Sequence, residues 1–274
     1  MYFSIVTTCF NSSNTIRNTL DSILHQTFCD YEYIVYDAGS TDGTVDILNE
    51  YVHYFNGRMK YTSEPDNGIY DGMNKGVNDA QGHYVSILNS DDYYHGDTLK
   101  RVYEASKKYE IEELPIIFGD VCRIKRNGEP VYRYHFDYSR IERNIPFGHP
   151  SMFVPKRVYE EEGLYDYKKY KLAADMDFQY RLYRKKDNYK WIVLDQLFTY
   201  MREGGATDNL ENIKKWTKEM TDLEVEYNDK KRMSAVIESF VGRIGRSLKN
   251  RLPYSVQKKM YNIYRVNKNE YTHR

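Results

Sequence analysis

Short apolar runs alternate with amphipathic segments along the first 120 residues. The runs at 2–8 and 31–36 are rich in β-branched and aromatic residues, which favours strands. Between them, over 16–24, apolar residues recur at the spacing of one helix face. The alternation continues, with strands predicted at 59–62, 84–88 and 116–118 and helices at 44–54, 74–80 and 97–109. Strands that alternate with helices of this length predict an α/β fold with parallel strands and right-handed crossovers.

Polar, turn-rich loops follow three of the predicted strands, at 37–43, 64–72 and 89–92. In an open α/β sheet the ligand crevice lies outside the carboxyl ends of the strands. We therefore expect the three loops to converge on one side of the sheet and to form the functional site there.

The pattern is less regular after residue 120. An Asn-Gly pair at 127–128 lies between two short polar-apolar runs, which predicts a hairpin over 123–133. The other expected elements are a strand at 191–194 and helices at 176–187, 209–227 and 233–266, the last broken near Pro253. These patterns divide the chain into an α/β domain at 1–205 and a helical extension at 206–274.

Charge is distributed unevenly, although 40 Lys and Arg residues balance 40 Asp and Glu residues. Residues 230–274 contain 12 basic and two acidic residues, so they carry a formal charge of +10 and the rest of the chain −10. Basic and apolar residues alternate here, a pattern suited to an anionic membrane surface. A helix that packs on the domain with a solvated basic face fits equally well. Nucleic acid is a weaker third interpretation, because no recognition motif accompanies the charge.

Composition narrows the class of protein. A chain with 41% hydrophobic and 29% charged residues is globular, not disordered. No stretch approaches the roughly 20 apolar residues that a membrane span needs. The first residues have neither a basic leader nor a small-residue cleavage site, so we expect no signal peptide. Three widely spaced cysteines predict neither a disulfide framework nor a metal site, and fit a reducing cytosol. The motifs GxGxxG, HExxH and GxSxG and the P-loop are absent.

Asp91 and Asp92 give the clearest indication of a site. Two adjacent carboxylates at the end of an apolar strand repel each other unless a cation or solvent offsets their charge. Hard divalent cations such as Mg²⁺ or Mn²⁺ take oxygen ligands and often keep phosphate oxygens in their shell. The pair is therefore a candidate for holding a metal ion against a diphosphate. A solvated turn or a helix N-cap is the alternative.

Two further loops carry candidate binding residues. Asp37 ends the second strand, where it can accept hydrogen bonds from a nucleobase or ribose, or cap the helix that begins near Thr44. Asp42 fits that cap role well. Lys75 lies where a polar loop enters a helix, and a helix N-terminus favours anions such as phosphate. An ordinary surface loop before a capped helix would have the same composition.

Acidic and imidazole side chains recur in the second half. Asp175 and Asp177 lie near a helix start, where one can act as a general base and the other as a cap or an orienting partner. The alternative is that both are helix N-terminal acids stabilised by the helix dipole. His149, in a Pro/Gly-rich loop at 145–155, can reach a metal-bound phosphate or an acceptor. A histidine in a loop is also commonly a hydrogen-bonded structural residue.

Together these motifs resemble glycosyltransferase family 2 with the GT-A fold, a Rossmann-like, mixed, mainly parallel sheet flanked by helices. The resemblance rests on six ordered segments, at 4–11, 37–44, 64–68, 74–76, 89–92 and 174–177. It covers about residues 1–205, with a nucleotide-binding half at about 1–120 and an acceptor half at about 121–205. The basic helical extension at 206–274 lies outside it.

The resemblance implies an inverting transferase that uses a nucleotide-diphosphate sugar, a UDP-hexose or UDP-N-acetylhexosamine, with Mn²⁺ or Mg²⁺. The implied acceptor is a hydroxyl of a glycan or a polyprenyl-linked glycan in bacterial surface polysaccharide synthesis. Such an enzyme is expected in the cytoplasm, peripheral on the inner face of the plasma membrane through residues 230–274, without a nucleic-acid partner.

The family's motifs imply roles residue by residue. Asp37 corresponds to the aspartate that contacts base and ribose, and Asp175 to the catalytic base that takes a proton from the acceptor. Asp92 is the expected metal ligand beside Asp91 of the donor site, and His149 belongs to the acceptor or diphosphate loop. The other expected donor contacts are Thr8, Phe10, Asn11, Asp66 and Lys75.

Two positions depart from the family's pattern, and two other functions stay open. Ala174 and Ala38 stand where acidic residues are frequent, but each leaves its neighbouring aspartate in place.

A sugar-phosphate nucleotidyltransferase also handles nucleotides and metal, although its Gly-rich, Arg-containing N-terminal loop is missing here. A nucleotide-sugar or carbohydrate-binding protein without turnover is the other alternative, and the acids Asp91, Asp92 and Asp175 argue against it.

Overall fold

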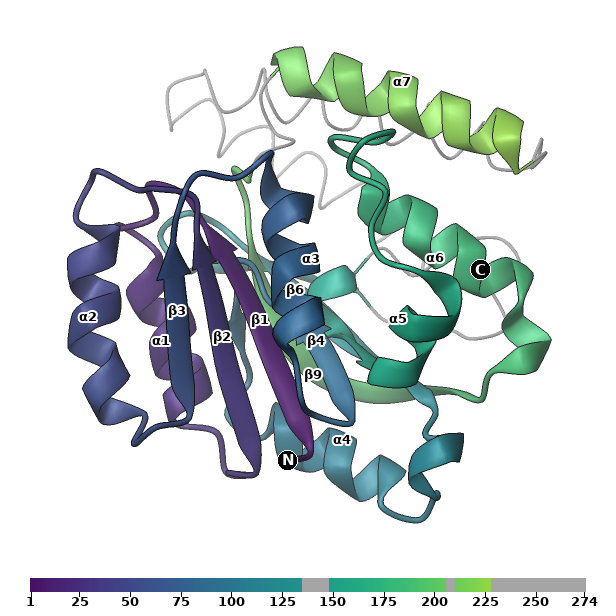
Figure 1. The fold of residues 1–274 in the computed structure, drawn as a ribbon, viewed down its shortest axis with the longest axis horizontal. Helices are drawn as coiled ribbons and strands as arrows, with labels where there is room; N and C mark the ends of the chain where they lie inside the picture. The colour runs from purple at the N-terminus through teal and green to yellow at the C-terminus, as the bar shows by residue number, and fades with distance from the viewer. Residues whose placement is uncertain (135–147, 206–209, 228–274) are drawn as a thin grey trace, which may run out of the picture. The chain divides into compact units, whose positions relative to one another are not determined.

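The structure is a computed structural model of the 274-residue chain, and it describes residues 1–134, 148–205 and 210–227 (Figure 1). The chain divides into two compact units, Met1–Gly205 and Ala206–Arg274. The first unit contains the sheet and all the residues expected to form the site.

Strands and helices alternate through the first half of the larger unit, as the apolar pattern predicts. The elements are β1 (Phe3–Cys9), α1 (Ile16–Leu24), β2 (Tyr31–Asp37), α2 (Thr44–Tyr54), β3 (Met59–Ser63), α3 (Ile69–Asp79) and β4 (Tyr84–Ile87). The four strands are parallel neighbours in the order β3-β2-β1-β4. Their carboxyl ends therefore share one edge of the sheet.

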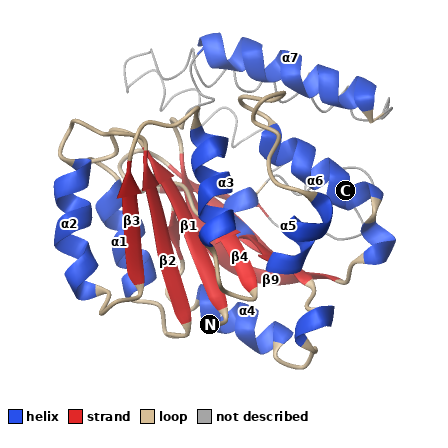
Figure 2. Cartoon of the chain, in the orientation of Figure 1, coloured by secondary structure: helices blue, strands red, loops and turns tan. Residues whose placement is uncertain are grey.

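The second half contains more antiparallel pairing than the strand–helix alternation predicts. Its elements are β5 (Tyr93–Tyr94), α4 (Thr98–Ser106), β6 (Ile116–Ile124), β7 (Pro130–Tyr134), β8 (Met152–Pro155), α5 (Lys156–Glu162), α6 (Ala174–Arg184) and β9 (Trp191–Arg202), with 3₁₀ turns at Ile111–Glu113, His149–Ser151 and Lys186–Asn188. Strand β8 joins the two halves, because it pairs antiparallel with both β4 and β6. The sheet order is β3-β2-β1-β4-β8-β6-β9-β5, with β7 paired to β6, so the sheet is mixed (Figure 2).

Several element boundaries differ from the prediction. The hairpin around Asn127-Gly128 is confirmed as β6–β7, with Gly128 at φ 85°. Strand β9 continues to Arg202, eight residues beyond the predicted end, because Asp195 and Gln196 interrupt its apolar pattern without ending its pairing with β6. Strand β5 and helix α5 were not predicted, since two and seven residues are too few to show a period.

Helix α3 begins at Ile69, five residues before the predicted start at Asn74. Gly72 and the polar residues around it made the first turn resemble a loop. Gly72 and Gly76 both lie within the helix and face β1. A Cβ atom on Gly72 would lie 2.8 Å from Thr8 Cγ2, and one on Gly76 would lie 2.2 Å from Val6 Cγ1. The glycines therefore let α3 approach the sheet closely, and this packing outweighs their low helix propensity.

The opposite face of the sheet carries the main apolar core. Helix α1 contributes Ile16, Leu20 and Ile23, which are fully buried. Figure 2 shows α1 behind the sheet and α3 in front of it. With both faces covered, β1 is buried along its whole length, which explains its continuous β-rich sequence.

The smaller unit is described through one helix, α7 (Leu210–Glu226), which confirms the helix predicted at 209–227. Its buried apolar side chains recur at helical spacing and are Ile213, Trp216, Met220 and Leu223. The helix expected at 233–266 lies outside the described residues. Within the part of the chain that the structure describes, no helix is both long enough and apolar enough to cross a bilayer.

Candidate active site

Asp37 closes β2, with its carboxylate turned into the following loop, and is only 1% exposed. It accepts hydrogen bonds from the backbone N–H groups of Gly39 (3.1 Å) and Ser40 (2.9 Å), from the hydroxyl of Ser63 (2.6 Å) and from the hydroxyl of Ser40. Burial by itself raises the pKa of Asp37, but the Ser40 and Ser63 bonds outweigh it and hold the pKa below the ordinary value. Asp37 is thus a firmly held, ionised carboxylate at the sheet edge.

The loops after β1 and β2 bind each other at this edge. The backbone N–H of Asn11 donates to Ser40 Oγ (2.7 Å), and the backbone N–H of Thr41 donates to Asn11 Oδ1 (2.9 Å). Asn11 has φ of 49°, a left-handed conformation that asparagine tolerates better than most residues. Beside it, the Phe10 side chain is 62% exposed, so the rim presents an aromatic ring to solvent.

Thr8 and Asp66 both lie close to Gly72, in the first turn of α3. The Thr8 hydroxyl is buried and has no hydrogen-bond partner among the described residues. Asp66 accepts a hydrogen bond from the backbone N–H of Gly68 (2.8 Å), and burial, together with the charges of Asp71 and Asp37, raises its pKa. The charge of Lys75 offsets this rise only in part. A buried hydroxyl and a partly desolvated acid are groups that a polar ligand would satisfy.

Lys75 does not lie at a helix N-terminus. The expectation that the helix dipole would help it to bind phosphate was therefore wrong. It is the seventh residue of α3, because the helix begins at Ile69. Its ammonium group pairs with Glu64 Oε1 at 2.7 Å and lies 5.9 Å from the centre of the Tyr36 ring. The Glu64 bond raises the pKa of Lys75. A role for Lys75 in donor binding therefore has no support from the helix dipole.

The loop after β4 places its two acids in different environments. Asp92 is 1% exposed, and its carboxylate accepts hydrogen bonds from the backbone N–H of Arg202 (2.9 Å) and from Asn89 Nδ2 (3.1 Å). Asp91 is less buried, and its carboxylate accepts no hydrogen bond from any other described residue. Burial raises the pKa of both acids, and the charge of Asp91 raises that of Asp92 further. Of the two carboxylates, that of Asp91 is therefore the more open to a ligand, as far as the described residues show.

This donor set fits a divalent ion held jointly with a substrate. Among the described residues, no group of three or more His, Cys, Asp or Glu side chains is arranged to hold a metal. Mg²⁺ is, however, commonly held by one or two carboxylates, with phosphate oxygens and waters completing its shell. Asp91 has the desolvated carboxylate that such an ion would neutralise. Asp92 fits less well, because it is only 1% exposed and each of its oxygens already accepts one hydrogen bond.

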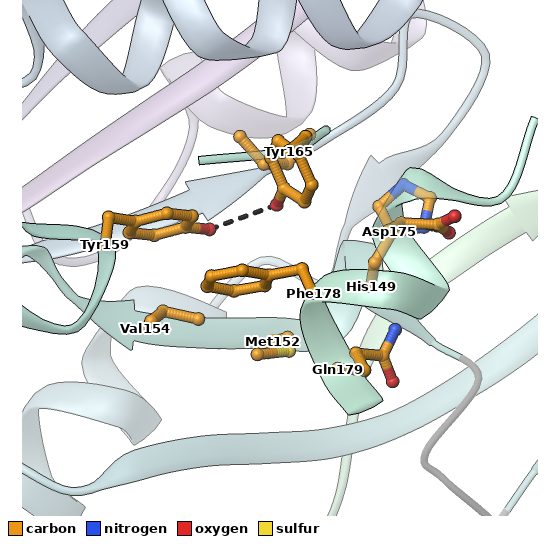
Figure 3. A pocket seen from close by; sticks show the side chains of 9 residues that line it. His149, Met152, Val154, Tyr159, Tyr165, Asp175, Phe178 and Gln179 are labelled. Carbon is orange, nitrogen blue, oxygen red and sulfur yellow. Dashed lines mark hydrogen bonds and ion pairs between the residues drawn. The ribbon is translucent and has the colours of Figure 1, made fainter. Parts of the chain in front are cut away.

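Asp175 is the second residue of α6 and lies beside His149 at a small pocket (Figure 3). Both of its carboxylate oxygens have partners. Tyr70 donates its hydroxyl to Oδ1 at 2.6 Å, and His149 Nδ1 lies 3.2 Å from Oδ2. Burial opposes ionisation of Asp175, but the hydrogen bond and charge of His149 and the hydrogen bond of Tyr70 lower its pKa overall. At neutral pH Asp175 is therefore a carboxylate, 17% exposed at the edge of a small pocket.

The predicted convergence of the loops is confirmed. Ser12, after β1, lies 2.9 Å from Ser90, after β4, through their hydroxyl oxygens. His149 Nε2 lies 3.5 Å from Asn89 Oδ1, which connects the acceptor half to the same loop. The backbone N–H of Glu64 donates to Asp37 O at 2.9 Å, which brings in the loop after β3.

Three residues of the site were missed from sequence: Tyr70, Asn89 and Arg202. Tyr70 and Asn89 belong to segments that the sequence singles out, at 64–76 and 89–92, but no spacing shows which of their side chains turn inward. Arg202 is the last residue of β9, eight residues beyond the end that the apolar pattern predicts, so no signal pointed to it.

Comparison with known proteins decides the family. A family model described as Glycosyl transferase family 2 matches residues 4–186, about two thirds of the chain. The chain belongs to glycosyltransferase family 2. The transferase is 34% identical over 182 residues to a PGL/p-HBAD biosynthesis glycosyltransferase of Mycobacterium bovis (strain BCG / Pasteur 1173P2), a match that covers 66% of this chain and 69% of the relative. It is also 36% identical over 97 residues to chondroitin synthase of Pasteurella multocida (strain Pm70), covering 35% of this chain and 10% of that one.

Solved structures show the same fold. Residues 1–349 of TarS from S. aureus, in complex with UDP, superpose with a TM-score of 0.62 at 19% identity, covering 95% of this chain and 78% of that one. The complex of TarS 1–349 with UDP-GlcNAc gives a TM-score of 0.59 at 19% identity, covering 94% and 78%. The transferase therefore has the GT-A fold, and the resemblance seen in its motifs is confirmed. Its activity is glycosyl transfer from a nucleotide sugar.

Proposed function

We propose that the transferase moves a hexose or N-acetylhexosamine from UDP to a hydroxyl of a glycan or lipid-linked glycan, with inversion at the anomeric carbon. The observation that carries the proposal is the position of Asp175, an ionised carboxylate joined through His149 to the loop of Asn89 to Asp92. A base beside the donor loop fits one direct displacement, in which the acceptor oxygen attacks as the nucleotide diphosphate leaves.

Asp37, Thr8 and Phe10 are the proposed contacts to the nucleoside. The Asp37 carboxylate accepts hydrogen bonds from ribose or base, and the exposed Phe10 ring stacks on the base. The Thr8 hydroxyl, which has no partner among the described residues, gains one. The TarS structures with UDP and UDP-GlcNAc motivate UDP as the nucleotide. The relatives' roles in PGL/p-HBAD biosynthesis and chondroitin synthesis motivate a glycan or lipid-linked acceptor.

Asp91 is the proposed ligand of Mn²⁺ or Mg²⁺, in place of the Asp92 expected from sequence. When bound, the ion supplies positive charge that stabilises the leaving diphosphate. Asp92 instead fixes the loop, through Asn89 and the backbone of Arg202. Asp175 accepts the proton of the acceptor hydroxyl, and because it is already ionised it needs placement more than activation.

Substituting Asp175 tests the proposal directly. Purified enzyme is incubated with UDP-glucose, UDP-galactose or UDP-GlcNAc, Mn²⁺ and a panel of glycan acceptors, and both UDP release and product anomer are measured. We expect Asp175→Asn to lower kcat by roughly 100-fold or more, because a general base contributes about 10²–10⁴-fold. Donor affinity, measured by calorimetry, should change little.

Two outcomes would contradict the proposal. Turnover by Asp175→Asn close to that of wild type would remove Asp175 as the base, and a product that retains the donor's anomeric configuration would exclude a single displacement. Asp177→Asn is a matched control, because Asp177 also lies in the first turn of α6 but pairs with Arg181 at 3.0 Å.

A further inference from the structure

The two partners of Asp175 come from different parts of the fold. Tyr70 is on α3, in the nucleotide-binding half, and His149 is in the 3₁₀ turn that precedes β8. Each one contacts a different oxygen of the carboxylate, at 2.6 Å and 3.2 Å. A carboxylate held at both oxygens cannot turn about its last bond without breaking one contact. Its remaining lone pairs then keep a fixed direction.

Tyr70 packs against Tyr165, which is bound in turn by Asn74 of α3. Asn74, one helical turn later, donates from Nδ2 to the carbonyl of Tyr165 (2.8 Å) and accepts from the N–H of Tyr165 (3.0 Å) at Oδ1. The Tyr165 ring packs against the Tyr70 ring, with 5.8 Å between their centres. Helix α3 therefore binds both the segment that leads into α6 and the carboxylate at its start.

His149 extends this arrangement to the donor loop. Its Nδ1 faces Asp175 and its Nε2 faces Asn89 Oδ1, at 3.5 Å. Asn89 in turn donates to Asp92. Tyr70, Asp175, His149, Asn89 and Asp92 thus form one continuous line of polar contacts between α3 and the end of β4.

We propose that Tyr70 and His149 are positioning residues that fix the Asp175 carboxylate toward the acceptor, and that His149 ties its position to the donor loop through Asn89. This inference rests on the proposed role of Asp175 as the base. Within the described residues, the titratable groups that face Asp175 are Tyr70 from α3, His149 from the 3₁₀ turn and Tyr165 from the segment before α6.

The test uses variants that remove one contact at a time. Tyr70→Phe removes only the hydroxyl. His149→Gln keeps a nitrogen near the Nε2 position and loses the contact to Asp175, whereas His149→Asn keeps a nitrogen near the Nδ1 position. Tyr84→Phe is the matched control, since its buried hydroxyl donates to Pro115 O, at 2.8 Å.

We expect Tyr70→Phe and His149→Gln to lower kcat by roughly 10- to 100-fold with donor KM nearly unchanged, because displacement of a reacting group costs rate more than ground-state binding. His149→Asn should recover part of the loss. Both partners lower the pKa of Asp175, so removing either should move the acidic limb of the kcat/KM profile to higher pH. Tyr84→Phe should leave kcat and the limb unchanged.

Folded variants with wild-type kcat and an unmoved acidic limb would overturn the inference. A parallel rise in donor KM, without any shift of the limb, would overturn it as well, because that result indicates a donor contact. Asp175→Asn measured alongside separates the two proposals. If Asp175→Asn is inactive while Tyr70→Phe and His149→Gln behave like wild type, only the positioning role fails. If Asp175→Asn is active, the proposed base fails.

Discussion

Asp91 and Asp92 are adjacent in the chain and chemically identical, yet their surroundings give them different uses. Each carboxylate oxygen of Asp92 accepts a hydrogen bond, one from Asn89 and one from the Arg202 backbone, whereas those of Asp91 accept none from another described residue. Sequence shows the pair but not which member turns inward. That difference depends on Arg202, which is 110 residues away in the chain.

The two acids should therefore respond differently to substitution. Asp91→Asn should lower metal-supported turnover roughly 100-fold or more while changing the melting temperature little, because it removes charge from an oxygen that no described residue uses. Asp92→Asn should instead lower stability by about 1–3 kcal/mol, since its amide nitrogen would face the amide nitrogen of Asn89. Turnover against Mn²⁺ concentration and urea denaturation measure the two effects. A stable Asp92→Asn variant that loses its Mn²⁺ dependence would indicate that Asp92, not Asp91, is the metal ligand.

Helix α3 is the element on which the site depends most. Its start lies beside Asp66, its Tyr70 contacts Asp175, and its two inward glycines set its distance from β1. Lengthening the side chain at either glycine would push the helix away from the sheet. Since Tyr70 moves with the helix, a change in packing between α3 and β1 should displace Tyr70 and with it the Asp175 carboxylate.

Gly76→Ala tests this coupling. Alanine favours a helix by about 1 kcal/mol, but its Cβ would lie 2.2 Å from Val6 Cγ1, and overpacking costs about 1–3 kcal/mol. We expect a net loss of stability in urea denaturation and a fall in kcat. The double variant Val6→Ala/Gly76→Ala should recover part of both, because it removes the opposing methyl groups. Gly96→Ala, where a Cβ would meet nothing within 4 Å, is the control. Stability equal to wild type in Gly76→Ala would contradict the close packing.

Local patterns predicted the parallel half of the sheet well, because each strand and helix there has a clear period and polar residues mark the strand ends. They failed where packing overrides propensity. The glycines of α3 resemble a loop until Val6 and Thr8 of β1 are placed against them. The same limit applies to the site. Asp37, Asp91 and Asp175 were found from motifs, whereas Tyr70 and Asn89 were identified only from the contacts that they make in the structure.

At the scale of the whole molecule, charge separates the chain into two parts. Residues 230–274 carry +10 and the remainder −10, although the sum is zero. The whole of this basic segment lies outside the described residues, so its proposed contact with an anionic membrane rests on sequence. A basic residue near an anionic surface contributes about 1 kcal/mol, so several together would hold a protein to a lipid surface.

Removing residues 230–274 should therefore abolish sedimentation with vesicles that contain phosphatidylglycerol while leaving the α/β unit intact. Full-length protein should bind these vesicles at low salt, bind weakly at about 0.5 M salt because surface charges are then screened, and not bind neutral phosphatidylcholine vesicles. UDP-binding affinity, measured for both proteins, should be equal if the nucleotide site is contained in residues 1–205. Equal vesicle binding by full-length and shortened protein would place the membrane contact elsewhere, and would favour a role for the basic segment in packing on the enzyme itself.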